Sequence, residues 1–174
     1  MPIDGDTDFK YFLSGGSGNT NVNLSFAGDA STTEVVTNTL HNLFDKVTGV
    51  QSRDGYTDYR KIWFKNNHGS LTAQTAKAAI MNNSVETNVH FQIGVGSVKT
   101  TGTGGVNPAD EVSAPGGITF DDADGEANGL GVGGDGNIDA SEWLDIYIKR
   151  TITAGQTAKD NDTASLKVFA DSAE

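Results

Sequence analysis

Cysteine is missing from this chain of 174 residues, which excludes disulfide bonds and thiolate metal sites. Apolar residues are scarce as well, since 36% of the chain is hydrophobic while 22 residues are glycine. No stretch approaches the roughly 20 consecutive apolar residues that span a bilayer. Residues 1–9 are acidic and polar, unlike the basic and then apolar plan of a secretion signal. We therefore expect no membrane segment and a protein that stays where it is made.

Basic residues are also in deficit. The sequence has 12 lysines and arginines against 23 aspartates and glutamates, which gives a formal net charge of -11. A surface of this sign repels a phosphate backbone, so we expect no nucleic-acid partner. The acidity accords with plain solubility, and the alternative is a surface suited to a basic partner or to divalent cations.

The strongest pattern in the sequence is an alternation of apolar and polar residues with period two, which predicts half-buried strands. Residues 87–95 place Val89, Phe91 and Ile93 on one face, and Trp143–Ile152 alternate in the same way. Short segments rich in β-branched or aromatic residues predict the remaining strands: Phe9–Leu13, Val22–Phe26, Tyr59–Lys65, Lys77–Met81, Ile118–Phe120 and Ser165–Ala170.

The predicted strands are separated by runs of Gly, Asn, Asp, Ser and Thr, which are typical of turns. Thr100–Gly117 and Asp121–Gly136 form two long loops, and Leu40–Val47 would form one or two helical turns. The pattern predicts an all-β, single-domain β-sandwich of jelly-roll or immunoglobulin-like type with long Gly/Asp-rich loops. Within it, residues 1–23 are a candidate N-terminal arm and residues 24–174 the sandwich domain.

One acidic segment has the spacing of part of a calcium-binding loop. Residues 135–142 match the second half of an EF-hand loop, with Asp135, Asp139 and Glu142 as candidate ligands. The first and third loop positions fall on Gly131 and Gly133, which offer no carboxylate. The following residues read as a strand, so a polar turn is the preferred interpretation, with Ca²⁺ binding as the alternative and no other cofactor expected.

Motifs for catalysis are missing. The sequence has no Gly-x-Ser-x-Gly elbow and no cysteine nucleophile, and its glycine runs lack the Lys-Ser/Thr of a phosphate-binding loop. The three histidines, His41, His68 and His90, are far apart in the chain. We therefore predict a protein that is not an enzyme. The aromatic residues are expected in the core, although a lectin-like sandwich would expose some of them to sugars.

Three segments have a familiar sequence. They are Leu43-Phe-Asp-Lys-Val-Thr-Gly, then Asp58-Tyr-Arg-Lys-Ile-Trp-Phe-Lys-Asn-Asn-His, and the region Trp143–Ala170 with its Ile148-Lys-Arg-Thr-Ile-Thr-Ala-Gly. Together they resemble small virion structural proteins of tailed bacteriophages, over about half of the chain. This resemblance implies a β-sandwich without enzymatic activity that occupies a place in the virus particle.

Size, thin core and glycine-rich loops favour one member of that group, the capsid decoration or cement protein. Such a protein would be made in the host cytoplasm and would lie on the outer capsid surface, bound to the major capsid protein and to itself as a trimer. A tail, baseplate or fibre module and a carbohydrate-binding sandwich are the alternatives. The candidate partner contacts are six residues in the arm and the first long loop: Phe9, Tyr11, Phe12, Val106, Asn107 and Pro108.

Overall fold

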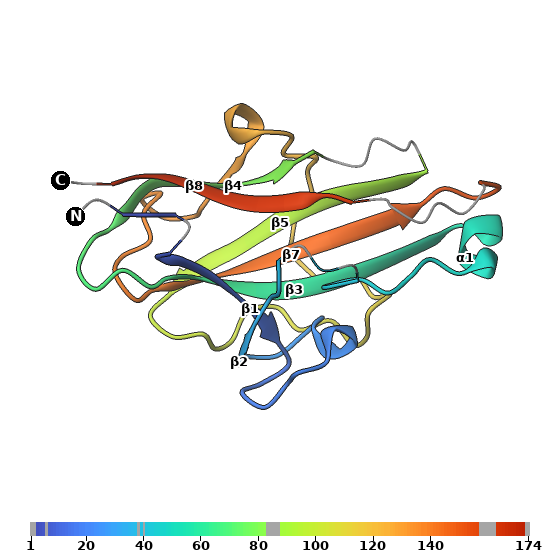
Figure 1. Ribbon diagram of the computed structural model, residues 1–174, viewed down its shortest axis with the longest axis horizontal. Helices are drawn as coiled ribbons and strands as arrows, with labels where there is room; N and C mark the ends of the chain where they lie inside the picture. The colour runs from blue at the N-terminus through green and yellow to red at the C-terminus, as the bar shows by residue number, and fades with distance from the viewer. Residues whose placement is uncertain are drawn as a thin grey trace.

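The computed structural model describes residues 3–5, 7–37, 39, 41–82, 88–156 and 163–172. These residues form two antiparallel sheets in two layers, which confirms the predicted β-sandwich (Figure 1). The larger sheet has the strand order β2-β1-β3-β7-β5, and the smaller sheet has the order β6-β4-β8. The strands are β1 (Phe9–Ser14), β2 (Ala30–Glu34), β3 (Tyr56–Asn66), β4 (Ala73–Met81), β5 (Val89–Lys99), β6 (Leu130–Gly131), β7 (Trp143–Ile152) and β8 (Ser165–Ser172).

Two long neighbouring strands form the centre of the larger sheet. β3 and β7 pair along their length, with Ile62 opposite Ile146 and Phe64 opposite Leu144. Because side chains alternate between the faces of a strand, these four point to one side of the sheet. They are buried there with Ile148, so the period-two pattern of the sequence marks the core directly.

The smaller sheet packs on this core face with unusually small side chains. Ala73, Ala76 and Ala78 of β4 are buried, and Ile80 and Val168 fill the space around them. The alanines allow the two layers to approach closely. Residues 73–79 are rich in alanine, which favours helices, but they form part of strand β4.

Loops cover the opposite face of the larger sheet, where the strands carry polar and aromatic side chains. Lys61, Trp63, Asp145 and Tyr147 are all buried on this face. The Lys61 ammonium donates hydrogen bonds to the carbonyls of Gly28 (3.0 Å) and Gly104, from two different loops. One buried lysine thus ties both covering loops to the sheet.

Three predictions about local structure are wrong. Residues Val22–Leu24 form a 3-10 helix, in which the side chain of Asn21 accepts a hydrogen bond from the backbone N–H of Asn23. Ile118–Phe120 lie outside the strands; of residues 40–47, those at 41–44 form a turn and bends and those at 45–47 are irregular. The short helix begins later, as α1 (Gly49–Asp54).

A capping box explains why α1 begins where it does. The Thr48 hydroxyl accepts from the N–H of Gln51, and the Gln51 side chain accepts from the N–H of Thr48. α1 lies at one end of the molecule, beside the start of β3 (Figure 1). Within the candidate arm 1–23, residues 9–14 form β1, between β2 and β3.

Candidate functional site: an apolar groove beside the smaller sheet

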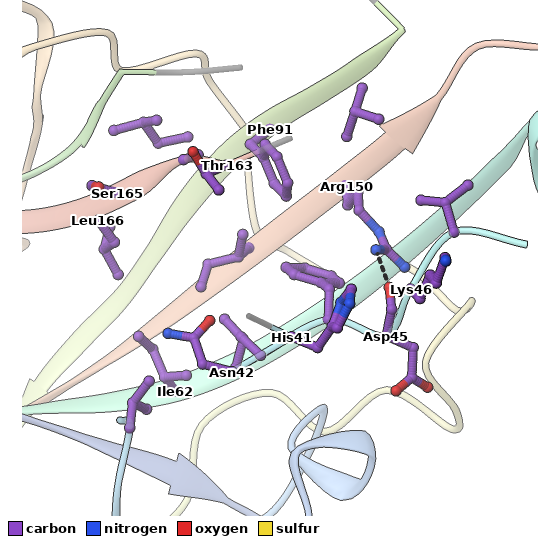
Figure 2. Close-up of a pocket in the computed structure, with 18 of the residues that line it drawn as sticks. His41, Asn42, Asp45, Lys46, Ile62, Phe91, Arg150, Thr163, Ser165 and Leu166 are labelled. Carbon is purple, nitrogen blue, oxygen red and sulfur yellow. Dashed lines mark hydrogen bonds between the residues drawn. The ribbon is translucent and has the colours of Figure 1, made fainter. Parts of the chain in front are cut away.

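In the part of the chain that the structure describes, the strands of the smaller sheet end before those of the larger one. The smaller sheet ends at the pair Met81–Ser165, whereas β7 continues to Ile152. The described residues leave a groove at this place, with a volume of about 690 Å³. Its lining is largely apolar on the side of the larger sheet, where β3 contributes Ile62 and β5 contributes Phe91 (Figure 2). Ile148 of β7 lines the groove as well.

One wall of the groove is the segment that precedes α1, called here the strap (residues 41–47). His41, Asn42, Asp45 and Lys46 of the strap lie along one side in Figure 2. Since the strap forms no helix or strand, other residues must hold its backbone in place.

Two arginines from the sheet hold the strap. Arg60 donates to the carbonyl of Leu43 (3.0 Å), and Arg150 donates to the carbonyl of Asp45 (2.7 Å). The ring of Phe44 interacts with both guanidinium groups, whose carbon atoms lie 5.2 and 4.6 Å from the ring centroid. This arrangement fixes the backbone of residues 43–45 against the larger sheet.

Both arginines are buried, and each has a carboxylate partner. Arg150 forms two hydrogen bonds with Asp58 (2.9 and 2.6 Å), and Arg60 pairs with Glu111 at 2.9 Å. The side chains of Arg150 and Asp58 are 5% and 2% exposed. Because a bidentate pair satisfies both ions, these charges are available to position the strap and not to attract a ligand.

The second wall is the beginning of β8 together with the residues just before it. Thr163, Ser165 and Leu166 line this side (Figure 2). Further along β8, the backbone N–H of Val168 donates to the Tyr11 hydroxyl at 2.9 Å. Burial raises the pKa of Tyr11 to about 12, although this hydrogen bond lowers it slightly.

The described residues at the rim of the groove carry polar groups whose formal charges balance. Hydroxyl and amide groups come from Thr37, Thr39 and Asn42, and the exposed Asp45 and Lys46 have opposite charges. On a chain with a net charge of -11, the described lining of the groove is therefore nearly neutral and largely apolar. It is suited to burying an uncharged apolar group.

The six predicted partner-contact residues lie in different places. Phe9 is buried in the core, Tyr11 lines the groove, and the ring of Phe12 lies 5.2 Å from that of Trp143. Val106 exchanges backbone hydrogen bonds with the Tyr147 hydroxyl, and the Asn107 side chain accepts from the N–H of Gly28. Pro108 is half-buried in the same loop. Tyr11 alone of the six lies at the groove.

The three candidate calcium ligands line a second, smaller pocket of about 350 Å³. Asp135 accepts from the N–H of Asn137, Glu142 accepts from the N–H of Asp139, and Asp139 accepts from the hydroxyl of Thr72. These bonds form a polar turn before β7. Among the described residues, no three His, Cys, Asp or Glu side chains are grouped closely enough to hold a metal ion.

The histidines are in separate environments. His41 lies in the strap, and the imidazole Nδ1 of His68 accepts from the N–H groups of Ser70 and Leu71. His90 lies 3.2 Å from Asp122 at the surface. The structure thus distributes them over three regions of the fold.

Comparisons with protein-family models, with curated proteins and with solved structures gave no match. In the described part of the chain, no helix has the length and apolar character needed to cross a membrane.

Sequence reasoning missed the arginines that shape the groove, yet the pattern contains a signal for them. Arg60 has the same strand phase as Ile62 and Phe64, and Arg150 has the same phase as Ile148 and Ile152. A charged residue in an otherwise inward-facing series indicates a buried ion pair at the end of the core.

Proposed function

We propose that this chain is a non-enzymatic structural subunit of a virus particle, most specifically a capsid decoration protein that attaches through the groove. The groove is the observation that carries the proposal. A domain of this size normally covers its apolar side chains, whereas here the partly exposed Leu43, Val89 and Leu166 line a groove of about 690 Å³ among the described residues. Such a surface is a contact site for another molecule.

The resemblance of the strand sequences to small tailed-phage virion proteins supports the choice of a virus particle. The residues that carry it are structural ones, since Ile62, Phe64 and Ile146 belong to the core. The rest of the fold also suits a passive subunit. Lys61 fastens two loops to the face of the sheet opposite the groove, through the carbonyls of Gly28 and Gly104.

A carbohydrate-binding function has less support from the aromatic residues. Trp63 is fully buried, and it packs edge-on against Trp143 at 6.5 Å between ring centroids. The Lys65 ammonium lies 5.0 Å from the centroid of the Trp143 ring. Sugar-binding sandwiches stack their ligand on exposed rings, and these two rings are occupied by contacts within the chain.

Mass spectrometry of purified virus particles from the source of the sequence tests the proposal. We expect the chain in the particle fraction after density-gradient purification, at a copy number comparable to that of the major capsid protein. The chain should leave the particles on mild treatment that keeps the shell intact. Its absence from particles, with the protein found free in the lysate, would contradict the proposed function.

A further inference from the structure

The ring of Phe44 in the strap lies over a place on the larger sheet that the strand register identifies. Arg60 of β3 pairs with Ile148 of β7. Two residues further along β7, Arg150 pairs with Phe91 of β5. Directly paired residues point to the same face of a sheet, as do residues two apart on one strand. The Phe44 ring contacts both guanidinium groups and lies 5.8 Å from the Phe91 ring, so it covers the surface beside Ile148.

The backbone of the strap has few contacts of its own. Among the described residues, none of those at 41–45 takes part in a hydrogen bond between two backbone groups. Arginine side chains hold the carbonyls of Leu43 and Asp45, and the side chain of Asn42 donates to the carbonyl of Val36 (2.8 Å). Such a segment has low local stability, because few buried contacts offset the conformational freedom that it gains on opening.

Movement of the strap leaves the charges beneath it paired. When the strap departs, Arg150 keeps its two hydrogen bonds with Asp58. Arg60 keeps its ion pair with Glu111. Because an unpaired buried charge is very costly, these two pairs lower the free energy of opening. Release of His41 from its φ of +58°, in the left-handed region that is unfavourable for a residue with a Cβ, favours opening as well.

The chain on either side of the strap is anchored. Before it, the N–H of Val35 donates to the carbonyl of Tyr11 (2.8 Å), which ties the end of β2 to β1. After it, the capping box of Thr48 and Gln51 fixes the beginning of α1. Residues 41–47 can therefore move while the strands and α1 remain folded.

We propose that the strap is a lid, which opens away from the larger sheet while the rest of the fold stays intact and thereby uncovers Ile148. In the closed state the Phe44 ring fills the space over this residue. The open state exposes apolar surface next to the groove. Its use for attachment rests on the proposed function, whereas the opening itself is a property of the isolated chain.

Thiol labelling tests the lid, because the chain has no cysteine and a single introduced thiol gives the whole signal. Ile148→Cys places the probe beneath the strap at a position that is 6% exposed, and Leu144→Cys places a control probe at a fully buried core position. We expect the thiol at 148 to react with a bulky aromatic disulfide reagent at least about tenfold faster than the thiol at 144 in native buffer.

The urea dependence of labelling separates opening of the lid from global unfolding. The rate at 148 should hardly rise in dilute urea, because the movement of the strap alone exposes little surface. The rate at 144 should rise steeply, because this thiol becomes accessible only when the sandwich unfolds.

A second substitution in the Ile148→Cys protein identifies the strap as the cover. Phe44→Ala removes the ring over the probe and should raise the labelling rate about tenfold or more. Phe120→Ala is the matched control, since Phe120 is also half-buried and packs on Tyr59, with 5.5 Å between ring centroids. Tyr59 alternates with Arg60 onto the other face of the sheet, so this control should change the rate by less than about twofold.

Equal labelling rates at 148 and 144, or a rate at 148 with the urea dependence of global unfolding, would overturn the inference. A rate at 148 that Phe44→Ala leaves unchanged would overturn it as well, since the reagent would then reach the probe without movement of the strap. If the lid opens and the chain is absent from virus particles, the lid stands and the proposed function is wrong. If the chain is present in particles and labelling at 148 requires global unfolding, the proposed function stands and the lid is wrong.

Discussion

At Gly105 the backbone passes directly over a buried carboxylate. A Cβ at this position would overlap the carboxylate of Asp145, and it would also approach the Lys61 ammonium and the Tyr147 hydroxyl. Gly105 has a φ of +82°, in the left-handed region that favours glycine. Its neighbour Gly104 has nearly the same φ, +83°, but a Cβ there would meet nothing within 4 Å.

These two glycines therefore separate backbone strain from steric overlap. We expect Gly104→Ala to lower the free energy of unfolding by about 1 kcal/mol, because alanine is strained at positive φ. We expect Gly105→Ala to lower it by about 3 kcal/mol or more, since the buried polar cluster must also shift. Urea denaturation measures both values, and equal losses would show that the loop is not packed on Asp145.

Lys61 makes the stability of the protein depend on pH. Burial lowers the pKa of Lys61 from 10.5 to about 8, and the carboxylates of Asp145 and Asp29 oppose this shift. Between pH 8 and pH 10 the native state then binds fewer protons than the unfolded chain, so the contribution of Lys61 to stability rises with pH. The limiting slope is about 1.4 kcal/mol per pH unit.

Comparison of the wild type with Lys61→Met isolates this contribution. The difference in free energy of unfolding between the two proteins should change over pH 8–10 in favour of the wild type. The pKa of Tyr147 is raised by burial and by the adjacent Asp145. Because Tyr147 is present in both proteins, its contribution to the pH dependence cancels in the difference. A difference that stays constant with pH would contradict a desolvated Lys61.

The Tyr11 hydroxyl stands in for a strand partner at the β8 edge, and its loss has a predictable cost. Tyr11→Phe should lower the free energy of unfolding by about 1–2 kcal/mol at neutral pH, because the Val168 N–H loses its acceptor. The raised pKa of Tyr11 stabilises the fold below pH 10, and this contribution is lost as the pH rises toward 12. The cost of the substitution should therefore shrink above pH 10, as measured by urea denaturation across this range.

At the scale of elements, the ion pair between Arg150 and Asp58 holds the strap in position. Asp58→Asn leaves the guanidinium of Arg150 buried without its carboxylate, and we expect a loss of about 3–5 kcal/mol in the free energy of unfolding. The double substitution Asp58→Leu with Arg150→Met should recover most of this loss, because it removes both charges.

The exposed pair between Arg53 and Asp54 in α1 provides the control. Asp54→Asn should change the stability little, since solvent screens this interaction. A double variant as unstable as Asp58→Asn would indicate that shape at this position, and not charge, determines the stability.

The elements that the sequence predicts well are those with a clear period of two. Trp143–Ile152 has the predicted bounds, and the pattern at 87–95 identifies the main part of β5. The wrong predictions concern short apolar segments that are flanked by turn-forming residues. Val22–Phe26 has the composition of a strand, but the side chain of Asn21 caps a 3-10 helix at that point.

The strap could not be predicted because its conformation depends on distant residues. Leu43 and Phe44 share one helical face in the sequence, yet Arg60 and Arg150 bond the carbonyls that a helix would use. The groove was missed for the same reason, since its lining residues meet only through the packing of the two sheets. The period-two pattern predicts which residues of a strand face the core, but it does not predict where one sheet ends above the other.

At the scale of the whole molecule, the self-association expected of a decoration protein can be measured directly. Light scattering after size exclusion should give the mass of a trimer, equal in calcium and in EDTA. A mass that falls on addition of EDTA would instead assign a metal-dependent role to Asp135, Asp139 and Glu142, which line the smaller pocket.

Cosedimentation with virus particles stripped of the chain tests most directly whether the groove attaches this chain to a particle. Ser165→Trp adds bulk at an exposed position on the groove wall, and Leu24→Asp, at an exposed residue of the 3-10 helix, is the matched control. The wild type and Leu24→Asp should sediment with the particles, and Ser165→Trp should remain in the supernatant while keeping the wild-type melting temperature. A wild-type chain that stays in the supernatant, or a Ser165→Trp chain that binds as well as the wild type, would contradict the account.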